Sequence, residues 1–173
     1  MANTTPTTNS LENYFLPFTA NKDFKKEPRL LDRGEGVYYW NHKGDQVIDA
    51  SSGLFCVPLG HGRKEIAEAV HQQLLKLDYS PSFQVSHLPA FSLAEKVAKL
   101  LPGDLNNVFF TICGSTAIDS AIKIIQAYQH AIGQSQRVRF VSRERAYHGV
   151  NIGGTSLSGM IKNREIFTAT MPG

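Results

Sequence analysis

The feature that most constrains the fold of this sequence is a short apolar run followed directly by glycine, serine and threonine. The run is Val108–Ile112, and a segment of this length and composition is typical of a strand buried on both faces of a parallel sheet. After Gly114, isoleucines recur at helical spacing as far as about Gly133, and residues 138–142 predict the next strand. Residues 108–142 therefore predict a strand–helix–strand unit and an α/β fold.

Four further elements are predicted before this unit. Residues 37–40 and 46–49 predict two strands joined by a glycine-containing turn. Apolar residues recur at helical spacing in 63–77 and in about 90–101, which predicts two amphipathic helices. Residues 11–28 mix aromatic and charged side chains without a period, and we interpret them as a docking arm.

The expected organisation has three parts. Residues 1–10 form a polar, disordered tail, residues 11–60 form an N-terminal arm and a small-domain hairpin, and residues 61–173 begin a larger domain with a mainly parallel sheet. The tail lacks the basic and apolar regions of a secretory signal, and no apolar run is long enough to cross a bilayer. These features predict a cytoplasmic protein that does not insert into a membrane.

Charge and cysteine content exclude several classes of function. The formal net charge is +3 and no run of lysine or arginine occurs, so we expect no nucleic-acid partner. Cys56 and Cys113 lie outside any CxxC pattern, and the six histidines show no spacing typical of a metal site. We therefore expect reduced cysteines and no bound metal.

The segment Gly114-Ser115-Thr116 is the first candidate binding site. The first N–H groups of a helix have no partner within the helix, and with the helix dipole they can bind a phosphate. Gly114 would allow close approach, and the hydroxyls of Ser115 and Thr116 would add donors. Taken alone, the segment is more often an ordinary turn in which Ser or Thr caps the helix.

Two other segments are candidates for binding. Tyr147 and His148 precede a loop rich in glycine and serine, and the tyrosine ring could stack on an aromatic cofactor or simply anchor the loop. Leu54 and Phe55 lie in a glycine-rich bend, and Phe83 follows a proline-containing segment. These side chains could line a pocket, although packing at a domain boundary is the commoner use of such residues.

Many short segments occur here in one order, and together they resemble a known family. They are Pro17–Asn21, Pro28–Leu31, Gly53–Cys56, Gly60–His61, Leu77–Tyr79, Leu101–Asn106, Val108–Thr111 and Arg143–Ile152. Nearly everything after the tail resembles the N-terminal part of a class III aminotransferase that depends on pyridoxal 5'-phosphate (PLP), closest to β-alanine (ω-amino acid):pyruvate aminotransferases. The resemblance implies an incomplete fold-type I transferase.

The resemblance also implies roles for the candidate residues. Gly114 and Ser115 match positions that hold the cofactor phosphate, with Thr116 beside them. Tyr147 matches the residue that stacks on the pyridine ring, and His148 belongs to the same motif.

Leu54, Phe55 and Phe83 match positions that line the substrate pocket of the family. The position matching Phe55 is commonly tryptophan, so the smaller ring would leave more room.

The sequence departs from the family pattern in two respects. The phosphate loop commonly reads Asn-Ser-Gly-Ser-Glu-Ala, whereas Ile112, Cys113 and Thr116 stand here at the first, second and fifth positions. The lysine that forms the Schiff base and the acid that protonates the pyridine nitrogen both lie further along the chain in the family. None of the ten lysines present matches that setting, so no catalytic residue is assigned and the chain looks truncated.

The resemblance implies transfer of an amino group from an ω-amino acid or amine, such as β-alanine, to pyruvate. We expect this chain alone to be inactive and to bind PLP weakly or not at all. The partner would be a second copy in a homodimer or a complementing C-terminal half. Two alternatives stay open: a non-catalytic fragment that acts only as an interaction partner, and an unrelated phosphate-binding domain, although no GxGxxG or GxxxxGK[ST] fingerprint is present.

Overall fold

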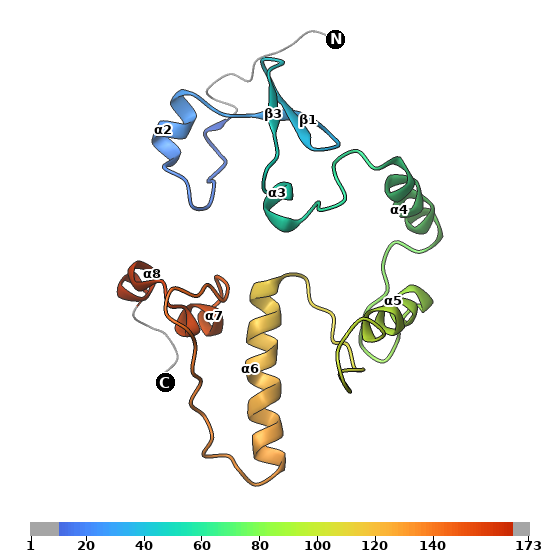
Figure 1. Cartoon of the computed structure of the whole chain (residues 1–173), viewed down its shortest axis with the longest axis vertical. Helices are drawn as coiled ribbons and strands as arrows, with labels where there is room; N and C mark the ends of the chain where they lie inside the picture. Colours follow the sequence, from blue (N-terminus) through green and yellow to red (C-terminus); the bar gives the residue numbers. More distant parts are fainter. Residues whose placement is uncertain (1–10, 168–173) are drawn as a thin grey trace. The chain divides into compact units, whose positions relative to one another are not determined.

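The computed structural model describes residues 11–167, and the contacts within the chain define two compact units, Met1–Ser86 and His87–Gly173. Each unit is described by itself (Figure 1). The division falls later in the chain than the expected limit between residues 60 and 61, and the expected domain limits stay a prediction. The predicted tail, residues 1–10, lies outside the described residues.

The first unit contains a three-stranded antiparallel sheet in the order β1-β2-β3. Its strands are β1 (Leu31–Glu35), β2 (Tyr38–Asn41) and β3 (Gln46–Ile48). The turn between β2 and β3 contains Gly44 at φ +89°, a conformation that favours glycine. The predicted hairpin is therefore confirmed, whereas β1 was not predicted because its sequence, LDRGE, is mostly polar.

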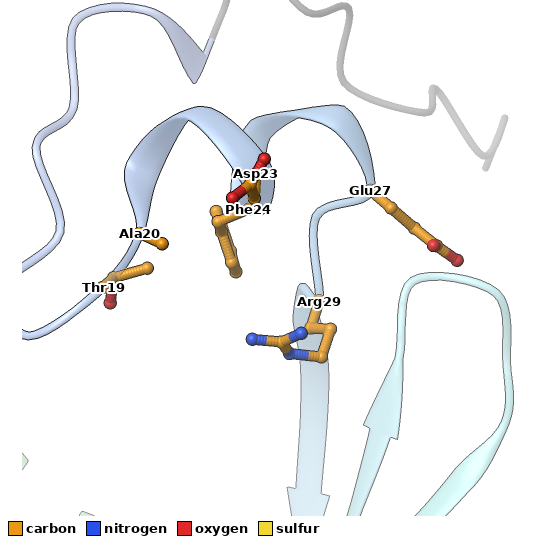
Figure 2. A pocket seen from close by; sticks show the side chains of 6 residues that line it. All are labelled: Thr19, Ala20, Asp23, Phe24, Glu27 and Arg29. Carbon is orange, nitrogen blue, oxygen red and sulfur yellow. The ribbon is translucent and has the colours of Figure 1, made fainter.

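The described part of the first unit, residues 11–86, contains the helices α2 (Asn21–Lys26), α3 (Ser52–Phe55) and α4 (Lys64–Lys76). The predicted amphipathic helix over 63–77 is confirmed by α4. Beside α2 lies a cavity of about 460 Å³, lined by Thr19, Ala20, Asp23, Phe24, Glu27 and Arg29 (Figure 2). None of the predicted site residues lines this cavity.

The second unit contains α5 (Leu88–Ala98), α6 (Gly114–Ala131), α7 (Ile152–Leu157) and α8 (Ile161–Ile166). The predicted helices after residue 90 and after Gly114 are confirmed by α5 and α6. The short helix α7 lies beside the amino-terminal half of α6, within the segment predicted to be a glycine- and serine-rich loop (Figure 1).

The strands predicted at 108–112 and 138–142 are wrong for this structure. Both segments lack regular secondary structure, and neither belongs to the one sheet found in residues 11–167. A strand is held by hydrogen bonds to a neighbouring strand, and neither segment has such a neighbour among the described residues. Their apolar side chains are largely exposed instead, as at Ile112 and Val141.

Little of the described chain is buried. Among the residues whose burial is described, Ile122 is the buried hydrophobic residue, at 5% exposure, and it faces α7 from α6. Thr155 and Ser158 are buried polar residues of the same region. No helix among the described residues is both long and apolar enough to cross a membrane.

Candidate functional site

The amino-terminal end of α6 is open to a ligand. The helix begins at Gly114 after the extended residue Cys113, whose side chain does not cap the helix. A Cβ atom added at Gly114 would meet no other atom within 4 Å, so there is space beside the first turn. The free N–H groups and the helix dipole favour an anion at this position.

The loop after residue 147 reaches the same helix end. The backbone N–H of Val150 donates a hydrogen bond to Oγ of Ser115 at 3.1 Å. Gly149 has φ +113°, and a Cβ atom there would lie 2.7 Å from both Cα and Oγ of Ser115. Only glycine allows this approach, in which the Ser115 hydroxyl oxygen is the acceptor.

A second contact fixes α7 against α6. The N–H of Gly154 donates to Oδ1 of Asp119 at 3.1 Å. A Cβ atom at Gly153 would lie 2.6 Å from that oxygen and 2.8 Å from Cδ1 of Ile122, so the glycine allows the two helices to touch. Asp119 was missed by the sequence reasoning, for which the paired glycines were the only available signal.

Tyr147 and His148 lie at the start of this loop. The Tyr147 ring is exposed, and its backbone is two residues from Gly149, which contacts Ser115. Nε2 of His148 is buried and has no hydrogen-bond partner among the described residues. A buried nitrogen without a partner is costly, so a polar group of a ligand at this position would stabilise it.

Cys113 lies directly before α6 and contacts its first turn. Its pKa is lowered, first by a hydrogen bond with the Thr116 hydroxyl and then by the backbone N–H groups of Thr116 and Ser115. The Sγ–Oγ1 distance between Cys113 and Thr116 is 3.4 Å. The Thr116 hydroxyl is therefore directed at the cysteine rather than free for a ligand.

The candidate pocket residues lie in the first unit and are described separately. Leu54, Phe55 and Phe83 are 74%, 84% and 87% exposed. Leu54 and Phe55 belong to the turn α3, where the N–H of Phe55 donates to the carbonyl oxygen of Ser51 at 2.9 Å. The structure therefore places Leu54 and Phe55 next to each other in one turn.

A buried carboxylate that the sequence reasoning missed anchors this turn. Oδ2 of Asp49 accepts a hydrogen bond from the Gly53 N–H at 2.6 Å and lies 2.8 Å from Nε2 of His61. Burial raises the pKa of Asp49, but hydrogen bonds from His61, Ser51 and Gly53 outweigh it and lower the pKa overall. The described residues hold no group of three or more His, Cys, Asp or Glu side chains that could bind a metal ion.

Comparison with known proteins assigns a family. Residues 19–173 match the family described as "Aminotransferase class-III". The chain is 49% identical over 162 residues to the β-alanine–pyruvate aminotransferase of Pseudomonas aeruginosa, a match that covers 94% of this chain and 36% of that relative.

Solved structures agree with this assignment. An (S)-enantioselective ω-transaminase from Thermomicrobium roseum aligns with a TM-score of 0.91 at 36% identity, over 95% of this chain and 37% of that protein. The ω-transaminase of Pseudomonas jessenii in complex with PMP aligns with a TM-score of 0.90 at 31% identity, again over 95% and 37%. The expected fold-type I class is confirmed, and the chain spans just over a third of the length of these proteins. The chain belongs to the class-III aminotransferase family.

Proposed function

We propose that this chain is the N-terminal portion of a PLP-dependent aminotransferase that transfers an amino group from an ω-amino acid or amine, such as β-alanine, to pyruvate. The observation that carries the proposal is the contact between Ser115, at the open end of α6, and Val150, in the loop that contains Tyr147. It joins the two segments that would hold opposite ends of one cofactor. The family and the PMP complex of a neighbour imply PLP as that cofactor.

The residues present fit a phosphate group. The start of α6 has no side-chain cap hydrogen bond, and there is space beside Gly114. Gly114 and Ser115 would bind the phosphate, with Thr116 contributing its backbone N–H. Bound PLP supplies the electron sink that amino-group transfer requires.

Tyr147 and His148 would define the position of the cofactor ring. An exposed tyrosine ring offers a flat surface on which an aromatic ring can stack. Nε2 of His148, which has no hydrogen-bond partner among the described residues, would make a polar contact with the cofactor. Tyr147 and His148 directly precede Gly149 in the chain. The contact of Gly149 with Ser115 limits how far the two residues can move from α6.

Leu54, Phe55 and Phe83 would line the pocket for the amine donor. All three expose large apolar side chains, which is consistent with surfaces that another part of the enzyme or a substrate covers. Because the Phe55 ring is smaller than that of a tryptophan at the same position, it would leave room for bulkier amine donors.

No residue of this chain is assigned to the covalent or proton-transfer steps. The ten lysines do not match the setting of the family's reactive lysine, so we propose that residues 1–173 alone are inactive and bind PLP weakly or not at all. Residues 1–173 would supply the phosphate site and part of the donor pocket.

The proposal is tested by fusing residues 1–173 to the remaining part of the P. aeruginosa relative and measuring alanine formation from β-alanine and pyruvate. Activity is expected, with Ser115→Ala weakening PLP binding. Ser135→Ala is the matched control, because the Ser135 hydroxyl contacts His130 at the other end of α6. A fusion that binds PLP but transfers no amino group from β-alanine or any other amine would refute the proposal.

A second candidate function is non-catalytic interaction with a complementing C-terminal half or with an intact homologue. The exposure of large apolar side chains over both units favours it, because such surfaces drive association. Co-expression with the C-terminal part of the relative separates the two candidates: a stable complex without transaminase activity supports the interaction alone.

We also propose, as part of the first candidate, a cytoplasmic homodimer.

A further inference from the structure

The turn that carries Leu54 and Phe55 has an unusual backbone. Ser52, Gly53, Leu54 and Phe55 have φ values of +52°, +58°, +55° and +70°. Three of these residues have side chains, and L-residues rarely adopt the left-handed region even singly. A run of four therefore requires contacts elsewhere in the structure that hold it.

The carboxylate of Asp49 supplies those contacts. Its Oδ2 accepts from the N–H of Gly53, inside the turn, and its Oδ1 accepts from both the N–H and the hydroxyl of Ser51 at 3.2 and 3.1 Å. The Ser51 hydroxyl oxygen in turn accepts from the Leu54 N–H at 3.4 Å. The Asp49 side chain is only 5% exposed, so water competes little for these bonds.

His61 holds the carboxylate through the same oxygen that accepts from Gly53, Oδ2, at 2.8 Å. Its side chain is 13% exposed, and its backbone exchanges two hydrogen bonds with Gly36, at 2.8 and 3.0 Å. Its ring lies 4.2 Å from that of Tyr39, centroid to centroid. A Cβ atom at Gly34 would lie 2.9 Å from the His61 ring, so the imidazole is closely confined.

Because His61 is held by the sheet and Asp49 by His61, the geometry of the turn is tied to the sheet. We propose that Asp49 and His61 are positioning residues that hold the left-handed turn Ser52–Phe55 and thereby set donor specificity through Leu54 and Phe55. The specificity part rests on the proposed function, whereas the positioning part does not.

Positioning is tested on the 173-residue chain by hydrogen exchange with mass spectrometry, which does not require a monomer. Asp49→Asn is expected to speed exchange at Gly53 and Phe55 by about tenfold or more, because the bond to a charged acceptor is lost. His61→Gln keeps an N–H donor for the carboxylate. Exchange at Gly53 and Phe55 should therefore be slower in His61→Gln than in His61→Ala.

Controls and a milder change keep this test decisive. Asp45→Asn is the matched control, since Oδ2 of Asp45 only accepts from Asn41 within the β2–β3 turn. Ser51→Ala removes one partner of the carboxylate and should give an intermediate rate. Equal protection of the turn in Asp49→Asn and the control, or no protection in the unchanged chain, would overturn the positioning role.

Specificity is tested in the fusion by comparing β-alanine with 1-phenylethylamine as donors. Asp49→Asn is expected to change the ratio of their kcat/KM values by about tenfold, as a displaced apolar contact does, with PLP binding unchanged. An equal fractional loss of kcat/KM for both donors would show that Asp49 and His61 have a purely structural role and do not set specificity. If the unchanged fusion transfers from neither donor, the proposed function and the specificity role fail, while the exchange experiment still decides the positioning.

Discussion

Gly149→Ala tests the contact that joins the loop to α6. The new Cβ atom would lie 2.7 Å from Cα and Oγ of Ser115 and 2.9 Å from its Cβ, distances at which an atom must move. Inserting a methyl group into such a contact costs about 1–3 kcal/mol. The backbone at φ +113° adds about 1–3 kcal/mol for a residue other than glycine.

Gly133→Ala separates these two effects. Gly133 has φ +76°, but a Cβ atom there would meet nothing within 4 Å, so only a backbone cost is expected, about 1–2 kcal/mol. The assay is hydrogen exchange at the Val150 amide, which the Ser115 hydroxyl oxygen protects. The steric effect predicts about 5- to 150-fold faster exchange in Gly149→Ala than in the control.

The result that would refute this reasoning is equal exchange at Val150 in the two variants. It would show that the loop moves away from Ser115 without cost, and that the two segments of the proposed cofactor site are not held together. Faster exchange in Gly149→Ala with unchanged exchange within α5 would instead locate the damage at the contact. The α5 helix serves as the internal reference because its bounds, Leu88–Ala98, lie far from the loop in sequence.

Three further predictions follow from burial and from pKa values. The isolated chain should self-associate and lack a sharp thermal transition, because Ile122 is the one buried hydrophobic residue among those whose burial is described. A monodisperse monomer on size-exclusion chromatography with a cooperative transition would contradict this. Iodoacetamide should alkylate Cys113 faster than Cys56 at neutral pH, since hydrogen bonds lower the pKa of Cys113. Thr116→Val should slow the alkylation of Cys113, and mass spectrometry after timed quenching measures both rates. The pKa of Asp49 in the fold is depressed below 3.8, so its stabilising effect is present above pH 3.8 and is lost as the pH falls through the pKa of the folded state. Protection of the Gly53 amide from exchange, corrected for intrinsic rates, should fall over the same pH range, and Asp49→Asn should show no such step.

Helices were predictable from the sequence because their signal is local. The isoleucines after Gly114 and the apolar residues of 63–77 repeat at the helical period, and α6 and α4 form where that period runs. The apolar run at 108–112 carries a different kind of signal. It indicates a segment suited to burial, but a strand also needs a hydrogen-bonded neighbour, and no sequence pattern within the run specifies one.

The candidate site was predictable only in part for the same reason. The residue types at Ser115 and Tyr147 pointed to phosphate and ring binding, and the structure brings their two segments together. Asp119 and Asp49 carried no such signal, because their roles depend on contacts with residues 35 and 12 positions away. An acid within a helix or after a strand is indistinguishable in sequence from a solvated one.

The two units nevertheless use one structural device. A side-chain oxygen accepts a backbone N–H from a glycine-containing segment once in the first unit, Asp49 from Gly53, and twice in the second, Ser115 from Val150 beside Gly149 and Asp119 from Gly154. A Cβ atom would lie within 3 Å of another atom at each of these glycines: Val57 Cγ2 at Gly53, Ser115 itself at Gly149, and the His148 carbonyl oxygen at Gly154. A change on either side of such a contact should therefore release the whole segment rather than one residue, so that the proposed cofactor loop and the proposed donor turn each depend on a side chain that need not touch the substrate.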